Sequence, residues 1–175
     1  MLFSSLTPIA LLVALATSAL GATTAKQTVN DMTALHESVI KARESLEGWN
    51  GGLMGAIPVA SKIQGVQSAA ANARRSIDDA DGFDGEDSEA VMAAYQKLQP
   101  EIVGALNAAE KQAPAFKDAG VGFVARAMVN DLKTEKDKFE TAMQQKLPAE
   151  NYRKASPSVA EVDAAFDNAR KALAA

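Results

Sequence analysis

The sequence predicts an all-α protein, folded as a mostly antiparallel bundle of five helices. Apolar residues recur at helical spacing in five segments, and clusters of Gly, Pro and Asp separate these segments. No stretch alternates apolar and polar residues for long enough to predict a strand. Hydrophobic residues make up 47% of the chain and aromatic residues only 5%, since much of the apolar content is alanine, the strongest helix former.

Two helices are predicted in the N-terminal half. The first runs from about Thr28 to Leu46 and ends at the glycine-rich turn GWNGG. The second begins near Pro58, because proline is favoured in the first turn of a helix, and ends in the acidic stretch DDADGFDGED. Their apolar stripes are Val29, Met32, Leu35, Val39, Ala42 and Leu46, and then Val59, Ile63, Val66, Ala70, Ala73 and Ile77.

Three more helices are predicted in the C-terminal half. The third begins near Asp87 or Ser88 and contains Pro100, which is expected to kink it. The fourth runs from about Pro114 to Lys146, and the fifth begins at the helix-start signal Ser156-Pro157. Their apolar stripes are Val91, Tyr95, Leu98, Ile102 and Leu106 (or Ala105); Val124, Met128, Leu132, Phe139 and Met143; and Val159, Val162, Phe166, Ala169 and Leu173.

The beginning of the chain has the pattern of a secretory signal. Residues 1–21 contain no charge, an apolar run from Ile9 to Ala16, and small residues up to Gly21. A buried or membrane-anchoring helix is the alternative, but the run is short for a membrane span. We therefore expect export after cleavage of residues 1–21, with residues 22–175 forming one helical-bundle domain without a transmembrane segment. With no cysteine, that domain must be stabilised by its core alone.

Few side chains offer catalytic or metal chemistry. The chain has no cysteine and one histidine, His36, which excludes Cys–His pairs and multi-histidine metal sites. There is no Gly-x-Ser-x-Gly motif. The net charge of −4 and the scattered Lys and Arg disfavour nucleic-acid binding. Lys133 with Asp137 and Lys136 with Glu140 are four residues apart, so they are expected to pair on a solvated helix face. We expect no enzyme, no cofactor and no metal.

Three local features leave alternatives open. The acidic loop 78–87 could hold calcium, but it does not match the EF-hand template, and a solvated turn is favoured. Residues 120–125 fit a loose dinucleotide-binding pattern, but no strand precedes them. Trp49 could be an exposed anchor for apolar surfaces, although the favoured interpretation is that it covers one end of the bundle.

Four segments carry a resemblance to a known family. They are VNDMTALHESVIKARESLEGWNGG, KIQGVQSAAANARRSIDDA, the proline-containing VMAAYQKLQPEIVGALNAAEKQAPAF, and VGFVARAMVNDLKTEKDKFETAM. In this order they resemble the fungal hydrophobic surface-binding protein A family, which includes the cell-wall galactomannoproteins. The resemblance extends from about Thr28 to Leu173 and rests on pattern and composition rather than on an invariant motif.

The resemblance implies a secreted or cell-wall-associated protein without catalytic residues. Some members adsorb to hydrophobic solids and help to recruit secreted esterases such as cutinases. Mannoprotein relatives hold a fatty acid in the central tunnel of a five-helix bundle. The chain lacks the Ser/Thr-rich tail of the surface mannoproteins, so a freely secreted form is expected.

The favoured hypothesis is a protein that binds a fatty acid or similar lipid in an apolar tunnel of the bundle. Methionine-containing apolar walls adapt to variable guests. The alternative is a surface-active protein that coats apolar solids and recruits an esterase, although the sequence shows no obvious exposed apolar patch. An ordinary solid core remains the simplest account of the stripes. The charged pair Glu135-Lys136 is expected to interrupt the seam of the fourth helix near its middle.

Two sets of residues are predicted to contact the ligand. Donors for the head group are proposed among Ser61, Gln64, Ser68 and Tyr95. The predicted binding residues are Val66, Ala70, Tyr95, Leu98, Ile102, Val124, Met128, Leu132, Phe139, Val162 and Phe166.

Overall fold

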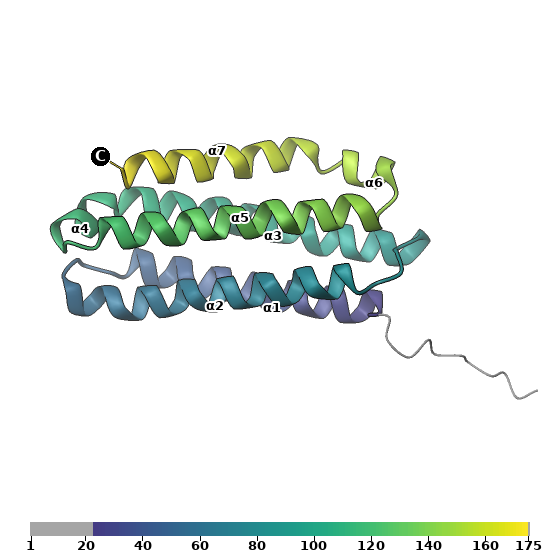
Figure 1. Cartoon of the computed structure of the whole chain (residues 1–175), viewed down its shortest axis with the longest axis horizontal. Coiled ribbons are helices and arrows are strands. Elements are labelled where there is room, and N and C mark those ends of the chain that lie inside the picture. The colour runs from purple at the N-terminus through teal and green to yellow at the C-terminus, as the bar shows by residue number, and fades with distance from the viewer. Residues whose placement is uncertain (1–22, 175) are drawn as a thin grey trace, which may run out of the picture.

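The computed structural model describes residues 23–174, which form seven helices and no strand. The all-α prediction is confirmed, whereas seven helices form where five were predicted. The predicted signal peptide, residues 1–21, lies outside the described residues. The helices in Figure 1 are α1 (Ala25–Glu47), α2 (Leu53–Asp78), α3 (Gly85–Lys111), α4 (Ala113–Asp118), α5 (Gly122–Lys146), α6 (Ala149–Arg153) and α7 (Ser156–Ala172).

The two additional helices are short, and one arises from a glycine. The predicted fourth helix is divided at Gly120, whose φ of 72° is a left-handed conformation that other residues adopt at a cost. This turn ends α4 and lets α5 begin at Gly122. The other short helix, α6, forms between Pro148 and Ser156, where the sequence predicted only a connection.

Three helices begin earlier than predicted, and the first of them, α1, begins at Ala25 instead of about Thr28. α2 begins at Leu53, so Pro58 lies inside the helix rather than at its start. α3 begins at Gly85 after the N-cap Asp84. The expected cap Ser88 is instead buried, and its hydroxyl accepts a hydrogen bond from Asn151 Nδ2 at 2.6 Å. α3 continues through Pro100 as one helix as far as Lys111.

The five long helices surround a narrow interior that runs along the bundle axis (Figure 1). Successive long helices run in opposite directions. α1 packs against α2 and α3, α2 packs against α5, and α3 packs against α7. The packed pairs α1/α3, α2/α5 and α3/α7 each run in the same direction, so most contacts between neighbours are parallel, whereas a mostly antiparallel bundle was predicted. α5 and α7 contact each other much less than the other neighbouring pairs do, which makes this seam the weakest side of the wall.

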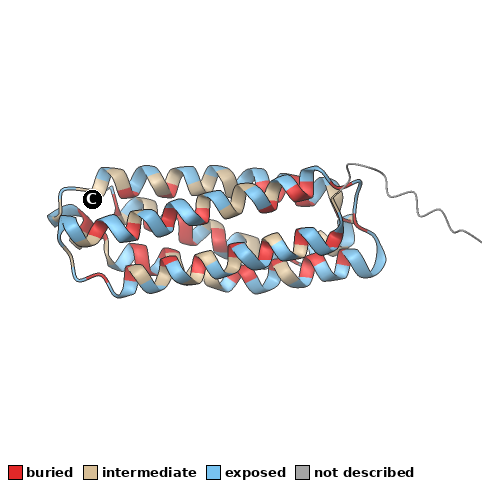
Figure 2. Cartoon of the chain, turned by 90° about the horizontal axis from the view of Figure 1, so that it is seen from below, coloured by how far each residue is buried: buried red, intermediate tan, exposed pale blue. Residues whose placement is uncertain are grey.

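The buried residues form two packed groups, one towards each end of the bundle. Figure 2 marks the buried positions along the helices. Ile102 and Leu132 are only partly buried, and they pack against both groups. Trp49 covers one end, because its ring lies 4.5 Å from that of Phe116 and its Nε1 donates to the Gly52 carbonyl oxygen at 3.2 Å. It is 6% exposed, so the alternative that Trp49 is an exposed anchor was wrong.

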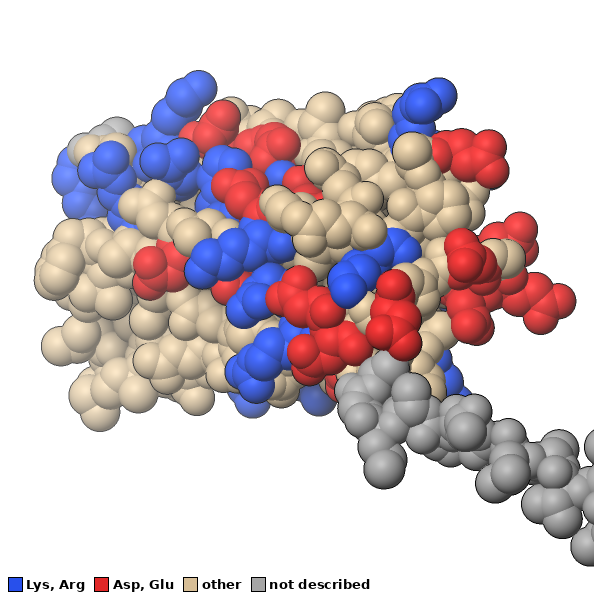
Figure 3. All heavy atoms as spheres, turned by 45° about the vertical axis from the view of Figure 1, so that its right-hand side comes forward, with Lys and Arg blue, Asp and Glu red and all other residues tan. Residues whose placement is uncertain are grey.

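The two ends of the bundle differ in surface chemistry. Acidic residues gather at the end that carries the turn between α2 and α3 (Figure 3). The opposite end exposes four large apolar side chains: Leu53 (58%), Met54 (79%) and Ile57 (59%) at the start of α2, and Phe123 (77%) at the start of α5. The sequence showed no obvious exposed apolar patch, so these four exposed side chains are a feature that the sequence did not reveal. Within residues 23–174, no helix is apolar over enough length to cross a membrane.

Candidate functional site

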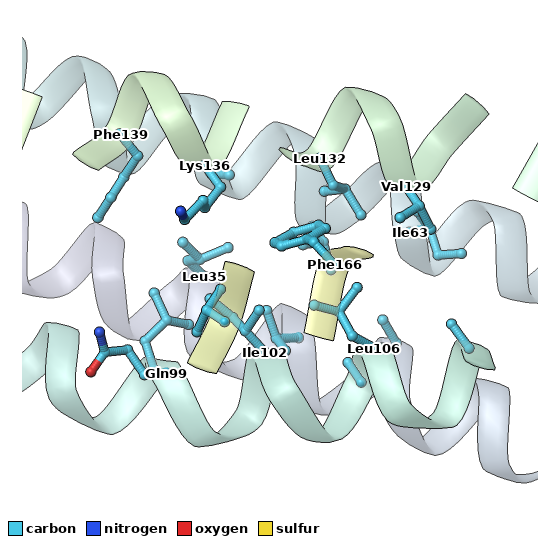
Figure 4. A pocket seen from close by; sticks show the side chains of 18 of the residues that line it. Leu35, Ile63, Gln99, Ile102, Leu106, Val129, Leu132, Lys136, Phe139 and Phe166 are labelled. Atoms are coloured by element: carbon cyan, nitrogen blue, oxygen red, sulfur yellow. The ribbon is translucent and has the colours of Figure 1, made fainter. Parts of the chain in front are cut away.

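An apolar cavity of about 100 Å³ occupies the interior between the two buried groups. All five long helices contribute side chains to its wall (Figure 4). Ile102 and Leu106 of α3 lie across the cavity from Leu132 and Val129 of α5, and the ring of Phe166 from α7 lies between them. The partly buried state of Ile102 and Leu132 follows from this cavity, since it leaves them without complete packing.

Polar side chains are concentrated at one end of this cavity. Tyr95 and Gln99 of α3 and Lys136 and Glu140 of α5 line it there. The Tyr95 hydroxyl donates to Glu140 Oε1 at 3.0 Å, and Lys136 Nζ lies 2.8 Å from Glu140 Oε2. Lys136 Nζ also donates to Asp163 Oδ1 of α7 at 2.6 Å. The cavity therefore has the pattern expected of a binding site for an amphiphile, because its wall is apolar over most of its length and polar at one end.

The protonation states of this cluster follow from burial and its partners. Burial raises the pKa of the Glu140 carboxyl, although hydrogen bonds from Lys136 and Tyr95 oppose the rise. Burial, then the charge of Glu140, raises the pKa of Tyr95, so its phenol stays protonated. Burial would lower the pKa of Lys136, but hydrogen bonds to Asp163 and Glu140 raise it overall. Burial would raise the pKa of Asp163, but Lys136 and Lys133 lower it overall. At neutral pH Lys136 is thus an ammonium and Asp163 a carboxylate.

A second ion pair strengthens the contact between α5 and α7. Lys133 Nζ donates to Asp163 Oδ1 at 3.3 Å, the same oxygen that Lys136 contacts. Because α5 and α7 otherwise touch little, Asp163 provides the main polar contact across this side of the cavity wall.

Comparison with known proteins places this chain in a family. The family described as hydrophobic surface binding protein A matches residues 25–145, which is more than half of the chain. The chain belongs to the hydrophobic surface binding protein A family. The matched segment includes α1 to α4 and nearly all of α5. No curated protein matches the chain.

Solved structures similar to this family member were determined with lipids bound. AfMp4p in complex with palmitic acid has a TM-score of 0.81 at 23% identity, covering 85% of this chain and 99% of that one. Ligand binding domain 2 of Penicillium marneffei MP1, complexed with multiple arachidonic acids, has a TM-score of 0.77 at 17% identity, covering 86% and 94%. Domain 1 of the same protein, with arachidonic acids, has a TM-score of 0.76 at 12% identity, covering 82% and 94%. At these identities the likeness shows a shared fold.

Most of the residues predicted to contact a ligand lie around the cavity of this family member. They are Val66, Ala70, Tyr95, Leu98, Ile102, Leu132, Phe139, Val162 and Phe166. The two others, Val124 and Met128, lie at a separate shallow groove that α2 and α5 form near the apolar end of the bundle. The neighbouring residues Ala125 and Val129 are buried instead, so the inward face of the first half of α5 lies one residue later than predicted.

The polar end of the cavity differs from what the sequence predicted. Ser61, Gln64 and Ser68 are exposed on α2, and of the proposed head-group donors only Tyr95 lines the cavity. The Lys136–Glu140 pair, expected on a solvated face, is largely buried, with side-chain exposures of 10% and 11%. The sequence did contain a signal that Lys136 is buried, because it lies four residues after Leu132 and three before Phe139, on the same helix face as the predicted apolar stripe.

The other candidate sites gain no support. Over residues 23–174, no three metal-ligating side chains come together, and this holds for the acidic loop considered for calcium. The glycines of the loose dinucleotide pattern lie at the α4–α5 turn and the start of α5, without the strand that such a site requires.

Proposed function

We propose that this hydrophobic surface binding protein A family member is a secreted, non-catalytic protein that binds a fatty acid or similar lipid inside the bundle. The observation that carries this proposal is the interior cavity, apolar along its length and polar at one end only. Such a site matches a molecule with a long acyl chain and one polar group. The lipid complexes of proteins with this fold, AfMp4p and the MP1 domains, support the same ligand class.

The size of the cavity indicates that binding requires expansion into a longer tunnel. About 100 Å³ is small beside the roughly 300–1,000 Å³ of typical small-molecule pockets. Each buried methylene contributes about 0.8 kcal/mol, so a long acyl chain can offset a substantial cost of separating helices. The α5–α7 seam is where separation breaks the fewest contacts, and we propose it as the route of uptake.

Lipid binding can be tested on the mature protein, residues 22–175. After delipidation under denaturing conditions and refolding, native mass spectrometry with palmitic acid should show a protein–lipid complex. Palmitic acid should also displace a fluorescent fatty-acid probe. A folded protein that shows neither the complex nor displacement of the probe would contradict the proposed function.

A second function is favoured by the exposed apolar end of the bundle. Leu53, Met54, Ile57 and Phe123 lie at one end, where they could contact an apolar solid without unfolding the protein. In this alternative the adsorbed protein recruits a secreted esterase. Met54→Ser with Phe123→Ser should reduce depletion of the protein by octyl beads at high salt, whereas the exposed control Ala93→Ser should not. Equal depletion of both variants would count against this end as the adsorbing surface.

A further inference from the structure

The polar end of the cavity contains a buried hydrogen-bond donor without an acceptor. Gln99 is 3% exposed and lines the cavity from α3. Its side chain lies next to Tyr95, whose hydroxyl is already directed at Glu140. Gln99 Nε2 is buried, and although the Tyr95 hydroxyl lies nearby, the two atoms do not reach hydrogen-bond geometry, so this nitrogen has no acceptor. Buried amide donors in proteins nearly always have a partner, so this nitrogen indicates a place for an acceptor that a ligand supplies.

A second donor lines the same end of the cavity from the opposite wall. Lys136 of α5 points into the cavity across from α3, which carries Gln99 (Figure 4). An ammonium has three N–H donors. Glu140 and Asp163 occupy two of them, at 2.8 and 2.6 Å, and Asp137 lies farther away at 3.5 Å. One donor can therefore serve an additional acceptor while Lys136 keeps its two closest partners.

A carboxylate is the ligand group that fits these donors. It carries only acceptors, two oxygens that can serve two donors, and a negative charge that strengthens a hydrogen bond from an ammonium. An ester lacks the charge, and an alcohol offers a single oxygen. Glu140 shows that this end of the cavity accommodates a carboxylate, because its own carboxylate bridges Tyr95 and Lys136.

We propose that Gln99 Nε2 and Lys136 Nζ bind the carboxylate of a free fatty acid, so that this protein selects free acids over esters and alcohols of the same chain length. Glu140 then competes with the ligand for Lys136 and sets how tightly the acid binds. This inference rests on the proposed function, since it assigns the orientation of the lipid: the carboxylate beside Gln99 and Lys136, and the acyl chain towards Phe166 and Val129.

The test compares palmitic acid with methyl palmitate and 1-hexadecanol in probe-displacement titrations of the delipidated protein. The wild type should bind the acid at least about tenfold more tightly than the ester, as expected for charge-assisted hydrogen bonds. Lys136→Met should lose most of this preference, because it removes the charged donor, and Gln99→Leu should reduce it, because the carboxylate then keeps only one of its two donors. The matched controls Gln96→Leu and Lys138→Met change exposed residues on the same helices and should keep the preference.

Glu140→Gln separates a binding role from a structural one. The substitution removes a competing charge but keeps the shape of the side chain, so palmitic acid should bind about tenfold more tightly while methyl palmitate binds as before. Equal binding of acid and ester by the wild type would overturn the inference, and so would a preference that survives in Lys136→Met or is undiminished in Gln99→Leu. If neither lipid binds, the proposed function itself fails; if both bind without preference, only the orientation is wrong.

Discussion

Ala70→Leu should make the ligand-free protein more stable and at the same time unable to bind an acyl chain. Ala70 lies on α2, is half-buried and lines the cavity, so a larger side chain can occupy space that is empty in this structure. Loss of binding after most core substitutions can be explained by unfolding. A variant that gains stability removes that explanation.

The magnitude follows from the size of the cavity. At about 24 cal/mol per Å³, a void of about 100 Å³ costs the folded state about 2.4 kcal/mol. Leucine adds three carbons, and burying them at about 0.8 kcal/mol each gives a similar upper limit of about 2.4 kcal/mol. Fixing the leucine side chain costs about 0.5–1 kcal/mol, and imperfect fit reduces the gain further. We expect the free energy of unfolding to rise by about 1–1.5 kcal/mol.

Urea unfolding of the delipidated protein measures the first effect, as a higher midpoint at an unchanged m-value. Probe displacement by palmitic acid measures the second. The matched control is Ala93→Leu, which makes the same change at an exposed position of α3 and should alter neither quantity much. A destabilised Ala70→Leu would mean that the cavity does not admit this side chain. Wild-type lipid affinity in a stabilised variant would show that the acyl chain binds elsewhere.

Three further predictions concern the seam, the charge cluster and the α4–α5 turn. Asp163→Asn replaces the carboxylate shared by Lys133 and Lys136 with a neutral amide and so weakens both contacts across the seam. Stopped-flow mixing should therefore show several-fold faster uptake of a fluorescent fatty acid, and an unchanged rate would argue against the seam as the route. Because the pKa of Asp163 is lowered from 3.8, its charge stabilises the fold above pH 3.8, and this stabilisation is lost as the pH falls through the lower folded-state value. Urea midpoints should therefore fall more steeply in acid for the wild type than for Asp163→Asn, and parallel curves would contradict the shift. Gly120→Ala should destabilise the protein by about 1 kcal/mol or more, because φ at this position is 72°. Gly65→Ala lies in open space within α2 and should stabilise the protein by up to about 1 kcal/mol. Equal urea midpoints for the two variants would refute this account.

The sequence predicted helix faces well where apolar and polar residues differ sharply. On α1, Met32, Leu35, Val39, Ala42 and Leu46 were predicted to face inward and are buried, whereas the sixth predicted residue, Val29, is only partly buried. Met32, Leu35, Ala42 and Leu46 each have only polar or smaller neighbours in the sequence, and Val39, although followed by Ile40, lies at helical spacing between Leu35 and Ala42. Only one face of the helix can therefore satisfy the core. The periodicity then determines the face without any knowledge of the partner helices.

On α5 the same reasoning selected the wrong side for the first two turns. Val124 and Ala125 are adjacent apolar residues, as are Met128 and Val129, so hydrophobicity alone does not choose between the two faces. The larger residue of the second pair, Met128, was predicted to point inward, but Val129 is the buried residue that lines the cavity, and Met128 lies in the groove beside α2. This choice depends on the distance between helices, which periodicity does not contain.

The charged end of the cavity was beyond sequence reasoning for a different reason. Lys136 and Glu140 are four residues apart, a spacing that is common on solvated helix faces. Their burial depends on two distant partners, Tyr95 and Asp163, which approach only when α3 and α7 close around α5. Similarly, because Pro58 indicated a helix start, residues Leu53 to Ile57 were not predicted to be helical, and the exposed apolar first turn of α2 was missed.

The empty interior also makes the volume change on unfolding depend on whether a lipid is bound. Unfolding eliminates the cavity, and about 100 Å³ per molecule corresponds to about 60 mL/mol, within the range of volume changes that let hydrostatic pressure unfold proteins. The lipid-free form should therefore unfold at lower pressure than the loaded form, in which an acyl chain fills this space. Pressure titration followed by Trp49 fluorescence would then report the occupancy of the cavity without any labelled ligand, since Trp49 is buried at the end of the bundle and becomes exposed on unfolding.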